Sequence, residues 1–140
     1  SMAIPRPLRA DSNASLSLLG YAARRSNQGV EVSLYWEAQQ KPTQDYTVFV
    51  QALDPAGRVI AQSDSYPDAG RFPTSRLDPG DVIRDVHTLT LDTSTGNRAI
   101  QLIAGLYRLD TMRRATFHRP GDVTTTDHVV LGNADSAASP

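Results

Sequence analysis

The chain has 140 residues and a formal net charge of −1 at pH 7. This length is typical of a single domain, which buries roughly two-thirds of its unfolded surface. The near-neutral charge argues against a dominant electrostatic attraction to nucleic acid or to an anionic membrane. Because the chain has no cysteine, disulfides, thiolate metal sites and thiol catalysis are excluded. No apolar run approaches the roughly 20 residues of a membrane-spanning helix.

The N-terminal stretch is polar and predicts no regular element. Residues 1–3 resemble the remnant of an expression tag, and residues 4–13 contain two prolines and two arginines with little apolar pattern. We interpret residues 1–13 as a tag remnant followed by an N-terminal arm. Residues 14–22 are the first predicted strand, in which Leu16 and Leu18 alternate with polar positions.

The clearest strand signal lies at residues 30–37. Apolar side chains on one face alternate with mostly polar ones on the other: Val30, Val32, Leu34 and Trp36 against Glu31, Ser33, Tyr35 and Glu37. Strict alternation is typical of a sheet with one face in the core and one face in solvent. We therefore expect Trp36 to anchor the core and Tyr35 to be an exposed aromatic.

The central part of the chain, residues 45–91, predicts a hairpin, a long loop and another strand. Residues 46–53 are rich in β-branched and aromatic side chains. Proline and glycine in residues 54–57 then favour a turn, and residues 58–62 are the returning strand. A loop over residues 63–81 precedes the strand at residues 82–91, where Ile83, His87, Leu89 and Leu91 share a face.

The remaining strands are expected at residues 99–109, 115–118 and 125–131. Seven or eight short strands separated by turns predict an all-β fold, namely a single antiparallel β-sandwich of immunoglobulin-like type, with a jelly roll as the alternative. No window shows helical spacing of apolar residues. We expect the domain to cover residues 14–132 and residues 133–140 to be a disordered tail.

Several sequence blocks carry a resemblance to a known family. They are Tyr46-Thr47-Val48-Phe49-Val50, Leu53-Asp54-x-x-Gly57-Arg58-Val59 and Phe72-Pro73-Thr74-Ser75-x-x-x-Pro79-Gly80-x-Val82-x-x-Asp85. Leu18-Leu19-Gly20-Tyr21, Leu34-Tyr35-Trp36 and Gly105-Leu106-Tyr107 extend the likeness over most of residues 16–131. In this order the chain resembles an extracytoplasmic β-sandwich module appended to bacterial membrane glycosyltransferases of the protein-mannosyltransferase type.

The resemblance implies a location at the cell surface or in a periplasm-equivalent compartment, with a membrane tether in a longer protein. It brings no catalytic residues, because the transferase chemistry of that family belongs to its membrane portion. We therefore expect that this chain is not an enzyme, although its parent protein would be a glycosyltransferase. The chain departs from the family after Tyr107, where Arg108-Leu109-Asp110-Thr111-Met112 replaces an Asp-Pro-x-Thr-Gly turn.

Histidines and aspartates offer little recognisable chemistry. The histidines, His87, His118 and His128, lack metal-ligand spacing, and His87 is expected to form a hydrogen bond inside the core. A Ser-His-Asp set is not favoured, because the chain has no Gly-x-Ser-x-Gly motif. Turn and ion-pair roles account for the aspartates around the long loop, with Asp85 pairing to Arg84 or Arg76. We predict no metal site and no cofactor.

The long loop is the predicted ligand-binding region. It combines aromatic surface, planar donors and hydroxyl groups, a mixture that suits a carbohydrate or glycolipid head group: Tyr66, Arg71, Phe72, Thr74, Ser75 and Arg76. In the alternative interpretation Phe72 and Leu77 plug the end of the sandwich, and Thr74 and Ser75 bind the loop's own backbone. Either way we expect an ordered loop that crosses between the sheets, with Arg71 and Arg76 in solvent.

The most favoured function is a non-catalytic accessory or carbohydrate-binding domain of a bacterial cell-surface glycan or glycoprotein assembly system. The alternative is a structural or protein–protein interaction module with no ligand of its own. A small hydrolase is a remote third class. The expected partners are a glycan or glycolipid, and a membrane-embedded transferase portion or another protein. Nucleic acid is not expected, and neither is a membrane span in this chain.

Overall fold

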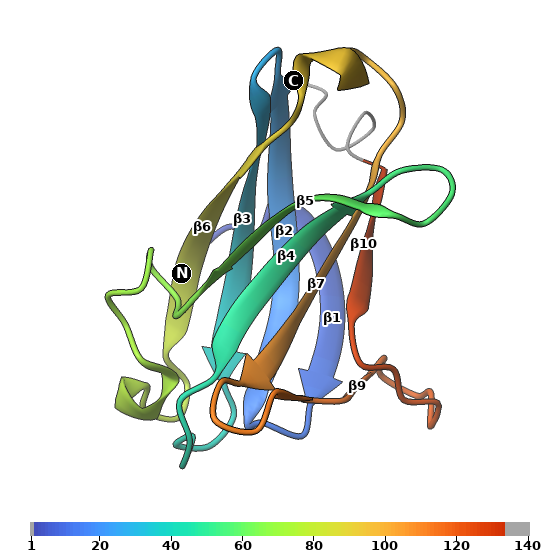
Figure 1. Ribbon diagram of the computed structural model, residues 1–140. Helices are drawn as coiled ribbons and strands as arrows, with labels where there is room; N and C mark the ends of the chain where they lie inside the picture. Colours follow the sequence, from blue (N-terminus) through green and yellow to red (C-terminus); the bar gives the residue numbers. More distant parts are fainter. Residues whose placement is uncertain (1, 134–140) are drawn as a thin grey trace.

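The computed structural model describes residues 2–133, which form two antiparallel β-sheets packed face to face (Figure 1). Sheet A has the strand order β6-β3-β2-β1-β9, and sheet B has the order β10-β7-β4-β5, with β8 paired to β7. The strands are β1 Arg6–Ser12, β2 Leu16–Ser26, β3 Gly29–Ala38, β4 Thr47–Leu53, β5 Val59–Ser65, β6 Val82–Thr90, β7 Gln101–Arg108, β8 Arg113–Arg114, β9 Phe117–His118 and β10 Val129–Asn133. The predicted antiparallel β-sandwich is confirmed.

Among the described residues, regular helix is confined to two single 3-10 turns, Thr74–Arg76 and Thr93–Thr95. No helix within residues 2–133 is long and apolar enough to cross a membrane.

The core lies between the sheets and is built from alternate side chains of the long strands. On β3 the inward residues are Val30, Val32, Leu34 and Trp36, and all four are buried as predicted. They meet Val48, Val50 and Ala52 of β4 and Leu102, Ala104 and Leu106 of β7. The ring centroid of Trp36 lies 6.3 Å from that of Phe117 on β9, so the core extends to the edge of sheet A.

The interpretation of residues 4–13 as an arm is corrected, because Arg6–Ser12 form β1 in the interior of sheet A. This strand pairs with β2 on one side and with β9 on the other, and Ala10 is buried in the core. The ladder shifts register between Pro7 and Ala10. Such irregularities are where a strand tolerates proline, which cannot donate a ladder hydrogen bond. Of the predicted tail, Asn133 ends β10, and residues 134–140 lie outside the described residues.

Tyr35 is not the exposed aromatic that we expected, since only 6% of it is accessible to solvent. Its cross-strand neighbours on the outer face of sheet A are Gly20 and Arg84. The side chain of Ile4 lies over Gly20, and Arg84 reaches across β3 to donate to the hydroxyl of Ser33 at 3.3 Å. The N-terminal segment and Arg84 therefore cover this part of the face.

The connections divide unequally between the two ends of the sandwich. Three join strands at the upper end of Figure 1, and all the others lie at the lower end. We call the lower end the loop-rich end; it comprises residues 13–15, 39–46, 66–81, 109–112, 115–116 and 119–128. Loops held by a rigid scaffold often carry the binding residues of a domain, so the loop-rich end is the first place to look for a site.

Candidate functional site

The long loop between β5 and β6 crosses from sheet B to sheet A, as predicted. Leu77 is buried, and Phe72 is partly buried against the core. Arg71 and Arg76 are both exposed. These positions confirm the expectation of an anchored loop with its arginines in solvent.

Two of the predicted ligand-binding residues hold the loop to the rest of the domain. Thr74 is fully buried; its hydroxyl donates to the carbonyl of Gln44 at 2.7 Å and accepts the N–H of Tyr46 at 3.0 Å. The backbone N–H of Ser75 donates to a carboxylate oxygen of Asp45 at 2.9 Å. The alternative interpretation expected these residues to bind the loop's own backbone. Their partners instead belong to the connection between β3 and β4, so the two residues tie one loop to its neighbour.

The other four predicted residues remain at least partly accessible. Arg71 lies over the start of the loop, with Nη2 3.2 Å from Oδ1 of Asp68. Arg76 is exposed, and Tyr66 and Phe72 are half-buried. A ligand site on this loop therefore stays a prediction, with these four side chains as the groups that a ligand could reach.

The most extensive buried polar network links the two sheets beside this loop. Nε2 of His87 lies 2.8 Å from Oδ2 of Asp85, and the indole N–H of Trp36 donates to the same oxygen at 3.4 Å. Oδ1 of Asp85 accepts the backbone N–H of Asp68 at 3.0 Å. Nδ1 of His87 lies 2.8 Å from the hydroxyl of Ser63 on β5. The expected core hydrogen bond of His87 is confirmed.

The expected pairing of Asp85 with Arg84 or Arg76 is wrong. The ladder between β3 and β6 places Asp85 opposite Leu34, on the face that points into the core. Arg84, one residue earlier, points to the opposite face, because successive side chains of a strand alternate. Asp85 therefore takes its partners from inside the sandwich.

Ser63, His87 and Asp85 have the composition of a nucleophilic triad, but their surroundings do not suit that role. The side chains of His87 and Asp85 have no solvent-accessible surface, so a substrate cannot approach the base. Both carboxylate oxygens of Asp85 are already engaged by donors other than the imidazole. A general base must reach the proton that it abstracts in a substrate pose. The network is suited to fastening the sheets together.

A pocket of about 220 Å³ opens at the loop-rich end, where the edge of sheet A meets the edge of sheet B. We call it the edge pocket. Its apolar lining is Ala10, Phe117, Val129 and Val130. Its polar lining is His118, Arg119, Asp122, Thr124, Thr126 and His128. A β-bridge between Phe117 and Thr126 ties β9 to the segment before β10 and holds the pocket together.

Two carboxylates have lowered pKa values in this region: Asp122, which lines the edge pocket, and Asp127, which contacts the lining residue His128. The pKa of Asp122 is lowered chiefly by the backbone N–H of Thr124, which donates to it at 2.9 Å. The pKa of Asp127 is lowered chiefly by a hydrogen bond from Nδ1 of His128 at 2.8 Å, and the positive charge of Arg114 acts in the same direction. Because Asp127 pairs with Arg114, the fixed charges left to the pocket are those of Asp122 and Arg119.

The two imidazoles of the edge pocket are oriented through Nδ1. Nδ1 of His118 lies 3.2 Å from the carbonyl oxygen of Arg119, and a carbonyl only accepts. Nδ1 of His128 likewise faces the carboxylate of Asp127. With the proton on Nδ1, each neutral ring offers Nε2 as an acceptor, and no residue within 2–133 bonds to either Nε2 atom. The same part of the chain contains no group of three His, Asp or Glu side chains that could hold a metal ion.

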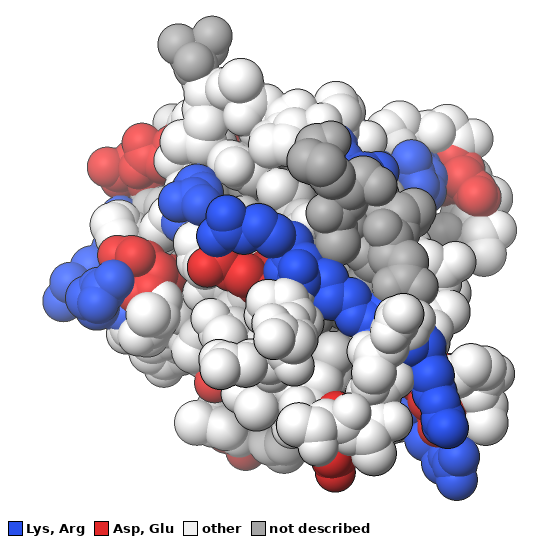
Figure 2. Space-filling view, turned by 90° about the horizontal axis from the view of Figure 1, so that it is seen from above, with Lys and Arg blue, Asp and Glu red and all other residues white. Residues whose placement is uncertain are grey.

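The opposite end of the molecule carries basic side chains in a band, with acidic side chains beside it (Figure 2). Structural contacts use several of the arginines of the turns there. Arg58 pairs with Asp54, Arg24 pairs with Glu31, and Arg25 donates to the carbonyl of Gly96. This pairing reduces the net field that the band presents to a charged ligand.

No family model matches the sequence, and no curated protein matches it. Among solved structures, the fold is similar to part of a β-glucuronidase from glycoside hydrolase family 2, with a TM-score of 0.45 and 11% sequence identity. That similarity covers 85% of this chain and 11% of the length of the enzyme's chain.

The sequence interpretation did not identify the edge pocket. Its residues come from β1, β9, β10 and the segment between the last two, and only the pairing of edge strands brings them together. His118 and His128 stood out as single histidines without metal-ligand spacing. The run of three threonines at residues 124–126, between an aspartate and a histidine, was the available signal of a polar rim.

Proposed function

We propose that this chain is a non-catalytic, carbohydrate-binding accessory domain that seats one sugar unit of a neutral glycan in the edge pocket. The observation that carries the proposal is the lining of this pocket, where hydroxyl, imidazole, carboxylate and guanidinium groups surround an apolar floor. Ligand pockets commonly combine an apolar lining with a few polar groups that fix the orientation of the ligand.

The polar groups suit the hydroxyl groups of a sugar, each of which both donates and accepts. Asp122 and Nε2 of the two histidines are acceptors, and Arg119 is a donor. The charges of Asp122 and Arg119 are opposite, which favours a neutral ligand over a strongly charged one. At about 220 Å³ the pocket is smaller than the roughly 300–1,000 Å³ of drug-sized ligand sites, so it suits a single ring.

The wider setting of the proposal rests on the sequence resemblance. A β-sandwich module of the glycosyltransferase type would lie outside the cytoplasm, tethered through a membrane portion of a longer protein. Its task would be to hold a glycan or glycolipid for a surface-glycan or glycoprotein assembly system, with the catalytic residues elsewhere. The long loop would then be a second contact region at the same end of the domain, through Tyr66, Arg71, Phe72 and Arg76.

A protein–protein interaction module is the second candidate, favoured by exposed apolar side chains at the loop-rich end. Leu109 and Met112 are 63% and 66% exposed at the tip of the β7–β8 hairpin, and Val123 is 97% exposed on the segment before β10. Exposed apolar groups that gather on one surface often mark a docking site for a protein partner.

The test is a glycan-array screen of the purified domain, followed by calorimetry with any neutral glycan that binds. His128→Ala and Asp122→Asn should weaken binding at least tenfold, and the double change Arg71→Ala and Arg76→Ala tests the contribution of the long loop. If only the Arg71 and Arg76 variant loses binding and the two pocket variants bind normally, the binding site lies on the long loop. Absence of binding across the array, together with pull-down of a protein partner that is lost in Leu109→Ser, would favour the interaction module.

A further inference from the structure

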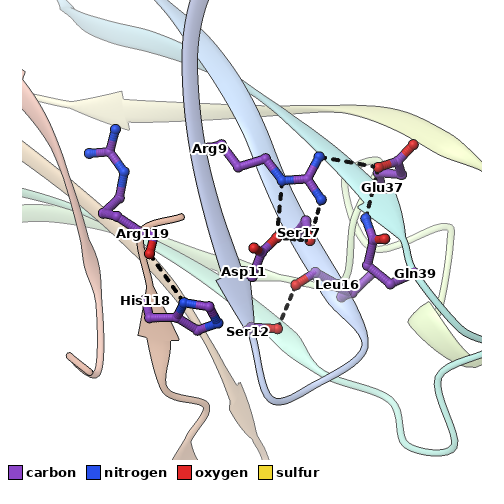
Figure 3. A network of polar contacts seen from close by, with 9 residues as sticks. All are labelled: Arg9, Asp11, Ser12, Leu16, Ser17, Glu37, Gln39, His118 and Arg119. Carbon is purple, nitrogen blue, oxygen red and sulfur yellow. Dashed lines mark hydrogen bonds and ion pairs between the residues drawn. The ribbon is translucent and has the colours of Figure 1, made fainter. Parts of the chain in front are cut away.

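A row of polar side chains crosses the outer face of sheet A next to the edge pocket (Figure 3). We call it the polar row; it consists of His118 on β9, Asp11 on β1, Ser17 on β2 and Glu37 on β3. These residues are direct neighbours in the ladders, since Asp11 faces both His118 and Ser17, and Ser17 faces Glu37. The row therefore runs perpendicular to the strands.

Three side chains of the polar row, those of Asp11, Ser17 and Glu37, are tied together directly or through Arg9 before any ligand arrives. The buried hydroxyl of Ser17 donates to Oδ1 of Asp11 at 2.6 Å, and Nε of Arg9 lies 3.1 Å from the same oxygen. Nη1 of Arg9 lies 3.7 Å from Oε1 of Glu37, which also accepts a hydrogen bond from Gln39 at 2.8 Å. Arg9, Asp11 and Glu37 nevertheless keep part of their surface in solvent. Fixed side chains lose less conformational entropy when a ligand binds them.

The polar row borders a shallow groove of about 320 Å³ whose lining includes Arg9, Asp11, Ser17 and Gln39. These side chains offer carboxylate and amide acceptors together with guanidinium and amide donors. One arginine faces two carboxylates in the row, so the surface mixes both signs of charge with a net negative balance. A neutral ligand rich in hydroxyl groups matches this mixture better than an anionic one.

His118 connects the polar row to the edge pocket. It lines the pocket, and in the ladder it stands directly opposite Asp11. Burial raises the pKa of Asp11. The hydrogen bond from Ser17, the charge of Arg9 and the charge of a protonated His118 together lower it by more, so the net shift is downward. When His118 is protonated, its charge also lowers the pKa of Asp122, after the bonds from Thr124. The imidazole thus lies within electrostatic reach of a carboxylate in each region.

We propose that the edge pocket and the polar row form one continuous track for a neutral oligosaccharide, with a terminal sugar in the pocket and the following units crossing His118 onto sheet A. This inference rests on the proposed function. The row spans four adjacent strands, or about 14 Å at the usual spacing between neighbouring strands. That distance exceeds a single sugar ring, so the track predicts a preference for chains over monosaccharides.

The experiment is calorimetry with neutral malto-, cello- and manno-oligosaccharides of one, two and four units. We expect the affinity of the wild-type domain to rise at least tenfold from one unit to four. The double change Glu37→Ala and Gln39→Ala should abolish this gain and leave monosaccharide binding unchanged, whereas His128→Ala should weaken binding at every length. Asp78→Asn, an exposed change away from the track, is the matched control, and circular dichroism checks that each variant is folded.

The outcomes separate the inference from the proposed function. If affinity does not depend on chain length, or the Glu37 and Gln39 variant binds tetrasaccharide normally while His128→Ala weakens binding, the track is excluded and the edge pocket alone remains. If the wild-type domain binds none of the three series at any length, both the track and the carbohydrate-binding proposal are overturned for these sugars.

Discussion

Nε2 of His87 lies 2.8 Å from Oδ2 of Asp85 in a part of the sandwich that solvent does not reach. The other ring nitrogen of His87 contacts Ser63, which belongs to the opposite sheet. One imidazole therefore connects the edge strands β5 and β6 across the open side of the sandwich. Within residues 2–133, no buried side-chain nitrogen or oxygen lacks a hydrogen-bond partner, so the network adds polar groups to the core without leaving any of them unsatisfied.

Removal of the carboxylate from this network should be strongly destabilising. Asp85→Ala leaves the imidazole of His87, the indole N–H of Trp36 and the backbone N–H of Asp68 without their shared partner. Breaking a buried polar pair on one side costs about 3–5 kcal/mol, and we expect a loss in that range. Urea denaturation measures it, with the exposed Asp78→Ala as control. Equal stability of the two variants would contradict the role given to Asp85.

Trp36 fills the core beside the same network. Trp36→Ala should cost about 3–5 kcal/mol in the free energy of unfolding, as is usual for large buried aromatic side chains. Trp36→Phe should cost less, because it keeps most of the apolar volume. Its remaining cost comes from the lost 3.4 Å hydrogen bond to Asp85. Thermal melts of both variants give the order, and a Trp36→Ala variant with unchanged melting temperature would rule out a core anchor.

The long loop allows stability to be separated from binding. Thr74→Val keeps the shape of the side chain and removes two hydrogen bonds of a fully buried hydroxyl, with Gln44 and Tyr46. Because these backbone groups are left unpaired, the free energy of unfolding should fall by about 1–3 kcal/mol. The double change Arg71→Ala and Arg76→Ala should leave the melting temperature nearly unchanged, since exposed arginines contribute little to stability. The opposite ranking of the two variants in thermal melts would show that the arginines hold the loop.

Strands with strict alternation could be predicted from sequence. Strand pairing and burial that depend on contacts with other segments could not. Residues 30–37 show the period of a half-buried strand, and the structure places Trp36 where that period predicts. β1 was missed because Pro5 and Pro7 obscure its apolar positions, and its pairing depends on a bulge opposite β2. Tyr35 is buried because Ile4 and Arg84 cover its surroundings, and no local pattern encodes that cover.

The same distinction applies to the candidate site. The inward position of His87 follows from its place in a strand, so its hydrogen bond in the core could be predicted. The contact of Asp85 with the backbone of Asp68 could not be predicted, because it depends on how the long loop returns over β6. The edge pocket and the polar row depend on the pairing of β1 with β9, a strand of two residues that is too short to carry a periodic signal.

A close contact between backbones constrains the start of β3. A methyl group added at Gly29 would collide with the carbonyl group of Leu89 on β6, and a backbone carbonyl in a ladder cannot move aside easily. Gly29→Ala should therefore cost about 1–3 kcal/mol, the usual range for overpacking. Asn27→Ala, an exposed change in the same turn, is the control for denaturant titrations. A Gly29→Ala variant as stable as the control would show that β6 can shift away.

The turn between β4 and β5 should give the domain a distinct acid sensitivity. Oδ1 of Asp54 accepts the backbone N–H groups of Ala56 and Arg58, both at 2.9 Å, and Nε of Arg58 lies 2.9 Å from Oδ2. These contacts, led by the backbone bond from Arg58, lower the pKa of Asp54 below its ordinary value of 3.8. A carboxyl whose pKa is lower in the folded state stabilises the fold fully above its unfolded pKa, and this stabilisation is lost as the pH falls through the folded value.

Asp54→Asn should therefore lower the melting temperature by a constant amount at neutral pH. The gap between variant and wild type should narrow once the pH falls below about 4, where Asp54 of the unfolded wild-type chain begins to take up its proton. Arg58→Ala is the matched comparison, because it removes the guanidinium but keeps the backbone N–H that contributes most to the lowered pKa of Asp54. The difference in melting temperature between Arg58→Ala and Asp54→Asn should also narrow in acid. Thermal melts from pH 7 to pH 2.5 measure both gaps. If the difference in melting temperature between wild type and Asp54→Asn stays constant down to the lowest pH, the ionised form of Asp54 does not stabilise this turn.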